Sequence, residues 1–196
     1  MRVGVVGVQG DVSEHVAALR AAMRAGGFGG EAVVVRRRED LAAVHALTIP
    51  GGESTTIGML LDRSGLREAI VRRATEGMPV LGTCAGCILL AKEGDGQVDR
   101  TGTPLLGLMD MAVDRNAFGR QRESFEADVA VDGLDRPFHA VFIRAPAITR
   151  TWGACAPTAR LQGVAVMARQ GALWGSCFHP ELSGDARIHV AFLSQV

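Results

Sequence analysis

A cysteine lies where an apolar stretch is expected to turn sharply into a helix. Residues 79–92 read PVLGTCAGCILLAK, which predicts a short strand, a turn that holds Cys84, and an apolar helix. Gly82 and Gly86 lack the side chains that would clash in such a turn. The turn would expose the sulfur of Cys84 at a helix N-terminus, where unpaired amides and the helix dipole favour the thiolate. We therefore predict that Cys84 is a nucleophile.

An imidazole and a carboxylate follow a second apolar run. His179, Pro180 and Glu181 come directly after residues 172–178, at the end of a predicted strand. If His179 reaches Cys84, it can take or hold the thiol proton while Glu181 fixes its tautomer and orientation. A histidine at a strand end is more often structural, but its combination with a cysteine at a sharp turn favours a Cys-His-Glu triad.

The glycine-rich segment PGGES, residues 50–54, follows another predicted strand at residues 46–49. Attack on an acyl carbon creates an oxyanion, which needs hydrogen-bond donors already in place. We expect the backbone amides of Gly52 and Ala85 to form this oxyanion hole. An ordinary turn is the simpler explanation of two adjacent glycines. A phosphate-binding loop fits less well, because the lysine that follows such a loop is missing.

The CxxC motif of Cys84 and Cys87 allows two other interpretations. A thiol-disulfide oxidoreductase also places such a pair at a helix N-terminus, and a zinc site could add Cys177 and His179 as ligands. The zinc interpretation leaves Glu181 without a role, and the redox interpretation leaves both the glycine turn and the His-Pro-Glu segment unexplained. We expect the other cysteines to be small buried side chains: Cys87, Cys155 and Cys177.

The elements that position these residues alternate between strands and helices. Strands are predicted at 2–8, 32–35, 46–49 and 79–82. Helices are predicted from Asp11 to Gly26, from the end of the PGGES turn through Leu61, and over 66–74. This order predicts a doubly wound α/β fold with a mostly parallel sheet flanked by helices. Ligands of such sheets bind beyond the carboxyl ends of the strands, where the PGGES turn and the Cys84 turn both lie.

The second half of the chain is less regular. Residues 94–103 are polar and predict a loop, whereas 124–131 and 140–143 predict strands. A hairpin is expected between 163–168 and 172–178, followed by a terminal helix at 185–193. We find no repeat or linker, so one domain spanning residues 1–196 is expected.

Composition excludes several classes of protein. The chain has 196 residues, 47% of them hydrophobic, and its 21 basic and 21 acidic residues give a formal net charge of +0. A dedicated nucleic-acid binder or a protein attracted to anionic membranes is therefore not expected. The N-terminal apolar run is too short for a signal peptide or membrane span. With only four cysteines, we expect a cytoplasmic protein without a disulfide framework.

Six segments of the chain together resemble a known family. In chain order they are GVVGVQGDVSEH, IPGGESTT, GTCAGCILLAKE, DRNAFGRQRESFEAD, VFIRAP and FHPELSGDARIH. The chain resembles the class I glutamine amidotransferases, which have a flavodoxin-like fold, and within them the glutaminase subunit of pyridoxal 5'-phosphate synthase. Each motif is modestly specific, but six in the same order are highly specific.

The resemblance implies an activity and assigns roles to residues. It implies hydrolysis of L-glutamine to L-glutamate and ammonia, without a cofactor or metal, with Cys84 as nucleophile and His179 and Glu181 completing the triad. The positions that match the family's glutamine contacts are Gly52, Glu53, Ser54, Arg115, Ile143 and Arg144. Without the resemblance, Arg115 would be interpreted as a surface ion pair and Ser54 as a helix cap.

The resemblance also implies a partner. Members of the family supply ammonia to the lyase subunit of pyridoxal 5'-phosphate synthase, which makes the vitamin B6 cofactor, so a large heteromeric complex is expected. Weak glutaminase activity without that partner is expected too, because free ammonia would be wasted. An amidotransferase subunit serving another pathway would retain the triad and remains an alternative.

Overall fold

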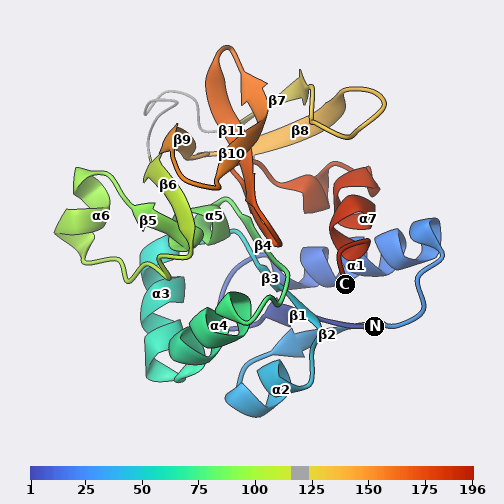
Figure 1. Cartoon of the computed structure of the whole chain (residues 1–196), viewed down its shortest axis with the longest axis horizontal. Helices are drawn as coiled ribbons and strands as arrows, with labels where there is room; N and C mark the ends of the chain where they lie inside the picture. The colour runs from blue at the N-terminus through green and yellow to red at the C-terminus, as the bar shows by residue number, and fades with distance from the viewer. Residues whose placement is uncertain (116–123) are drawn as a thin grey trace.

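A parallel sheet forms the centre of the protein, as the computed structural model shows for residues 1–115 and 124–196 (Figure 1). Its strands run in the order β2-β1-β3-β4-β12, and every neighbouring pair is parallel. Their bounds are Glu31–Val35, Arg2–Val6, Ala46–Ile49, Val80–Thr83 and Leu173–Ser176, respectively. β3, β4 and β12 are buried along their whole length, which explains their continuous apolar sequences.

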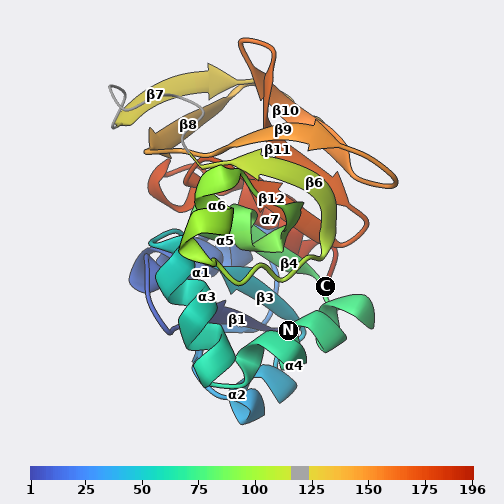
Figure 2. The same cartoon turned by 90° about the vertical axis from the view of Figure 1, so that its left-hand side faces the viewer.

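The sheet continues from β12 into an antiparallel half (Figure 2). β11 (Val164–Gln170) pairs with β12 and with β9 (Ala147–Thr151), and β9 pairs with β6 (Met109–Asp114). The edge strand β5 (Ala91–Glu93) lies parallel to β6, while β10 (Ala156–Leu161) pairs with the other side of β11. This mixed sheet confirms the predicted α/β class with antiparallel strands in the second half.

Helices cover both faces of the sheet (Figures 1 and 2). α1 (Val12–Gly26) packs beside the C-terminal α7 (Arg187–Leu193), and α3 (Ser54–Arg63) packs beside α4 (Leu66–Thr75) and α5 (Ala85–Leu90). Among the described residues, no helix has the length and apolar character needed to cross a membrane.

Two short helices form where the sequence did not predict them. The expected loop at 94–103 is wrong, because α6 (Gly96–Thr101) forms there. The side chain of Asp95 accepts hydrogen bonds from the amides of Gln97 and Val98, and so caps the first turn of this helix. The second helix, α2 (Arg38–Ala42), follows β2.

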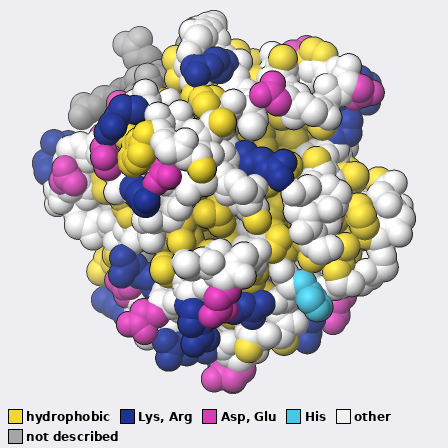
Figure 3. Space-filling model, in the orientation of Figure 1, with side chains coloured by type: hydrophobic (Ala, Val, Ile, Leu, Met, Phe, Trp, Pro, Cys, Tyr) yellow, Lys and Arg dark blue, Asp and Glu magenta, His cyan; other side chains and the backbone are white. Residues whose placement is uncertain are grey.

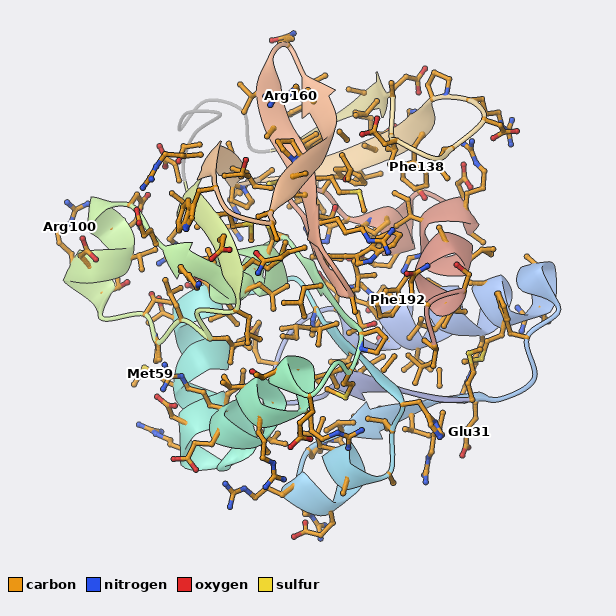
Figure 4. All side chains as sticks on the ribbon, viewed as in Figure 1. Glu31, Met59, Arg100, Phe138, Arg160 and Phe192 are labelled. Atoms are coloured by element: carbon orange, nitrogen blue, oxygen red, sulfur yellow. The ribbon has the colours of Figure 1, made fainter. Side chains whose placement is uncertain are left out.

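A separate two-stranded sheet of β7 (Ser124–Val129) and β8 (Phe138–Ile143) packs through aromatic side chains. The ring of Phe178 lies 5.8 Å from that of Phe138 and 5.5 Å from that of Phe142. Phe138 is labelled in Figure 4, as is Phe192 of α7, whose ring contacts Trp174 on β12. These contacts hold the chain in place directly before His179.

The surface carries charges of both signs. In Figure 3, basic and acidic side chains intermingle over one face with hydrophobic side chains between them. This distribution agrees with the formal net charge of +0.

Candidate active site

Cys84 lies on a strained turn between β4 and α5. Its φ is +48° and its ψ is −104°, a backbone conformation that is rare for a residue with a side chain. The chain can turn here only because the neighbouring glycines leave room. A Cβ on Gly86 would lie 2.1 Å from the carbonyl oxygen of Ile49, and one on Gly82 would lie 2.5 Å from the carbonyl oxygen of Gly86. The predicted sharp strand-to-helix turn is present.

The expected exposure of Cys84 is wrong, since the residue is only 8% exposed. The end of β8 covers it, and the sulfur lies 3.9 Å from the carbonyl oxygen of Ile143. The residue nevertheless lines a cavity of about 410 Å³. A substrate must therefore enter that cavity to reach the sulfur.

His179 reaches the same point because β4 and β12 are adjacent parallel strands that end at one edge. Their register pairs Thr83 with Ser176, and the amide of Cys84 donates to the carbonyl oxygen of Ser176 over 2.7 Å. The amide of His179 then donates to the carbonyl oxygen of Val141 on β8 over 2.8 Å. Three segments distant in sequence thus meet around the imidazole.

The imidazole of His179 interacts with both proposed partners. Burial alone would lower the pKa of His179, but hydrogen bonds with Cys84 and Glu181 outweigh it and raise the pKa to about 10. Nδ1 lies 2.6 Å from Oε1 of Glu181 and 3.5 Å from Oδ2 of Asp11. His179 therefore carries a proton at neutral pH, with Nδ1 donating to Glu181.

The side chain of Glu181 is fully buried beneath His179 in the short 3₁₀ helix η1 (Pro180–Leu182). Burial raises the pKa of the Glu181 carboxyl, and the hydrogen bond with His179 opposes that rise. Pro180 is the first residue of the 3₁₀ turn, which brings the carboxylate back toward the ring two residues earlier. Glu181 thus orients the imidazole of His179, which lines the same cavity as Cys84.

The cavity gathers the residues that the sequence singled out for substrate binding. Its walls include the following predicted positions: Gly52, Glu53, Ser54, Ala85, Arg115, Ile143 and Arg144. Sequence reasoning gave no substrate role to four further lining residues: Gln9, Asp11, Ile88 and Gln97. Gln9 and Asp11 follow β1 at the same sheet edge, so the strand-end rule could have indicated them.

A cation and an anion form an ion pair in the wall of the cavity. Nη2 of Arg115 lies 2.8 Å from Oε1 of Glu53, and the Arg115 side chain is only 12% exposed. Nη1 of Arg115 donates to the hydroxyl of Thr55 over 3.2 Å. Arg115 is therefore held within the cavity wall and is not an isolated surface ion pair.

The PGGES turn packs closely against the other site elements. Gly52 has a φ of +144°, and a Cβ on Gly51 would lie 2.4 Å from Cε1 of His179. The amide of Glu53 donates to Oε1 of Gln9 over 3.1 Å. Glu53, and not Ser54, caps α3 through its side chain, while the buried Ser54 hydroxyl has no hydrogen-bond partner among the described residues. Ser54 thus retains its hydrogen-bonding capacity beside the cavity.

The CxxC motif does not act as a unit in this structure. Cys87 is fully buried and hydrogen-bonded to Cys177, whose pKa is raised well above its usual range by burial first and then by Cys87. Burial also raises the pKa of Cys155 to about 11. The thiols of Cys155 and Cys177 are therefore protonated at neutral pH, and all three side chains are buried.

A shared metal site of Cys84, Cys87, Cys177 and His179 is not supported either. In the part of the chain that is described, the group of acidic, histidine and cysteine side chains close enough to hold an ion consists of Asp11, His179 and Glu181.

The fourth similarity segment, at residues 114–128, includes residues 116–123, which lie outside the described residues.

Comparison with known proteins gives consistent matches along the chain. Residues 5–196 match the SNO glutamine amidotransferase family. The chain is 50% identical to pyridoxal 5'-phosphate synthase subunit PdxT of Methanosarcina mazei, covering 100% of this chain and 98% of that protein. It is 52% identical to the subunit of the same name from Archaeoglobus fulgidus, covering 98% and 97%.

A solved structure supports the same assignment. A crystal structure described as a glutamine amidotransferase has a TM-score of 0.88 and 46% identity, covering 98% of this chain and 97% of that one. A PurLQS structure from Thermotoga maritima, at 17% identity and a TM-score of 0.68, shares the fold.

Proposed function

The chain belongs to the SNO glutamine amidotransferase family, and on this basis we propose that it is the glutaminase subunit of a pyridoxal 5'-phosphate synthase. It hydrolyses L-glutamine to L-glutamate and ammonia. The observation that supports this most directly is that Cys84 and His179 line one cavity with Arg115 and Glu53, while the buried carboxylate of Glu181 is hydrogen-bonded to His179. The proposal treats residues 1–196 as one glutamine amidotransferase domain.

Catalysis begins when Cys84, whose thiol proton is held by His179, attacks the side-chain carboxamide carbon of glutamine as the thiolate. The amides of Gly52 and Ala85 stabilise the negative charge that develops on the carboxamide oxygen. The carbon–nitrogen bond then breaks, and protonated His179 donates its proton to the departing ammonia. A γ-glutamyl thioester on Cys84 remains.

Hydrolysis of the thioester completes the cycle. His179, now neutral, removes a proton from water, which attacks the thioester carbonyl and releases glutamate. The leaving sulfur regenerates Cys84, and the imidazole is protonated again. Glu181 accepts from Nδ1 throughout, which directs the other ring nitrogen toward the reacting atoms.

The cavity also accounts for recognition of a free amino acid. A substrate with an α-carboxylate and an α-ammonium requires a cationic and an acidic partner. We assign the carboxylate to Arg115 and the ammonium to Glu53, which already form an ion pair in the cavity wall. Ser54, Ile143 and Arg144 complete the glutamine contacts.

The proposed partner is the lyase subunit of pyridoxal 5'-phosphate synthase, which would consume the ammonia within a heteromeric complex. The names of the relatives support it, since they are called subunits of this synthase. All four cysteines are free, which favours a reducing compartment. We therefore propose that the protein acts in the cytoplasm.

The experiment is glutamine hydrolysis by the purified chain, alone and with the synthase subunit. Glutamate and ammonia should form in equal amounts, with a higher rate in the complex. Absence of hydrolysis in both conditions contradicts the glutaminase proposal. Hydrolysis without binding to that synthase, together with co-purification with another ammonia-consuming enzyme, contradicts only the choice of partner.

A further inference from the structure

His15 is a buried titratable side chain that the proposed reaction does not use. It lies on α1, is 0% exposed, and belongs to the first of the six similarity segments. A second buried histidine, His189 on α7, lies beside it, with 6.1 Å between the ring centres. Burying two imidazoles costs free energy unless their nitrogens have partners, so the contacts of His15 are informative.

One nitrogen of His15 faces both the triad acid and the nucleophile turn. Nε2 is hydrogen-bonded to the hydroxyl of Thr83 over 2.9 Å, and Thr83 directly precedes Cys84. The same nitrogen lies 3.4 Å from Oε2 of Glu181. That oxygen is buried and has no hydrogen-bond partner among the described residues, whereas Oε1 is bonded to His179. Nε2 of His15 is therefore close enough to Oε2 of Glu181 to interact with it through a proton.

The surroundings determine the protonation state of His15. Burial lowers its pKa well below the usual value, and the charges of His189 and His179 lower it further. Burial also lowers the pKa of His189 to about 4, so both rings are neutral at neutral pH. A neutral ring carries one proton. If that proton were on Nδ1, the lone pair of Nε2 would face the Glu181 carboxylate, so the proton belongs on Nε2, where it lies between the Thr83 hydroxyl and Oε2 of Glu181.

We propose that His15 is a positioning residue that holds the Glu181 carboxylate toward His179 and links it, through Thr83, to the turn that carries Cys84. This inference rests on the proposed glutaminase function. The N–H of His15 stabilises the charged form of Glu181 at its second oxygen. The groups around this pair are His179 and Asp11 on one side and His189 on the other. Cys84 lies beyond His179.

The test compares side chains that keep or remove the donor. His15→Leu removes it, so Glu181 should gain a proton at higher pH and the acidic limb of kcat against pH should move up by about one pH unit. The maximal kcat of the complex with the synthase subunit should fall about tenfold. His15→Gln places an amide N–H near the position of Nε2 and should restore both values.

A matched control separates positioning from packing. His189→Leu removes the neighbouring buried ring, neither nitrogen of which has a hydrogen-bond partner among the described residues, and should leave the acidic limb unchanged. An unchanged limb and kcat in His15→Leu would overturn the inference. So would equal losses in His15→Leu and His15→Gln, or an equal shift in His189→Leu.

A second variant and a measurement without substrate complete the test. Should His15→Leu not fold by circular dichroism, His15→Asn replaces it, because its shorter side chain does not reach Glu181; identical pH profiles for the Asn and Gln variants would overturn the inference. Carboxyl ¹³C NMR of labelled glutamate, assigned with Glu181→Gln, measures the Glu181 pKa without substrate. It tests the His15 contact even if the wild type hydrolyses no glutamine, which would contradict only the proposed function.

Discussion

Nδ1 of His179 lies 2.6 Å from Oε1 of Glu181, and the carboxylate is fully buried beneath the ring. A charged acceptor at this distance fixes both the orientation and the tautomer of the imidazole. The hydrogen bonds with Cys84 and Glu181 raise the pKa of His179 to about 10 against the opposing effect of burial. The pH behaviour of the protein should therefore depend on this pair.

The first prediction concerns activity at high pH. Because the pKa of His179 is about 10, kcat/KM for glutamine should decline as pH rises through about 10, where the proton needed by the leaving ammonia is lost. Glu181→Gln removes one of the interactions that raise this pKa and should move the basic limb to lower pH. A basic limb at the same pH in wild type and Glu181→Gln would show that the carboxylate does not control His179.

The second prediction concerns stability. The pKa of His179 is higher in the folded state than its usual value of 6.5, so the folded protein holds this proton more tightly than the unfolded chain. Its stabilising contribution is fully present below about pH 6.5 and is lost as pH rises through about 10. The free energies of unfolding of wild type and His179→Gln, measured with urea, should therefore differ at about pH 6.5 and become more similar as the pH rises through about 10. A constant difference would contradict the assignment.

The third prediction concerns the turn around Cys84. Gly86→Ala places a Cβ 2.1 Å from the carbonyl oxygen of Ile49, so the strand and helix must separate. We expect a loss of about 3 kcal/mol in the free energy of unfolding, at the upper end for overpacked sites, together with loss of activity. Gly29→Ala is the matched control, because its Cβ meets nothing within 4 Å. Its free energy of unfolding should change by about 0.5 kcal/mol or less.

The fourth prediction concerns substrate recognition. Arg115→Lys keeps the charge but cannot hold Glu53 and Thr55 at once, so KM for glutamine should rise about tenfold or more while kcat changes less. Arg150, which pairs with Glu93 on the surface, provides the control. Arg150→Lys should leave KM unchanged. A larger fall in kcat than rise in KM for Arg115→Lys would place the residue in the chemical step instead.

Much of the fold and site was predictable from local sequence because the informative residues follow strands. The parallel strands are largely apolar runs, and the strand-end rule places the residues after β3, β4 and β12 at one edge. That rule predicts the meeting of Cys84, His179 and the PGGES turn without any knowledge of distances. It applies equally to Gln9, which follows β1.

The features that the sequence did not predict depend on non-local contacts. α6 forms in a polar stretch because Asp95 caps it, and it brings Gln97 into the cavity. β9 and β10 are short strands that pair with β11 in a part of the sheet whose order does not follow the chain. The burial of Cys84 results from β8, which lies 59 residues further along the chain. The partners of His15 likewise come from β4 and η1.

In the proposed reaction Cys84 attacks glutamine alone, without Cys87 of the CxxC motif. The most direct measurement is ammonia release from glutamine by wild type, Cys84→Ser and Cys87→Ser, each assayed with the synthase subunit. We predict that Cys87→Ser retains activity within a few-fold of wild type, whereas Cys84→Ser loses about 10⁴-fold or more. Ammonia release that persists in Cys84→Ser, or that is abolished by Cys87→Ser alone, would contradict the assignment of Cys84 as the nucleophile.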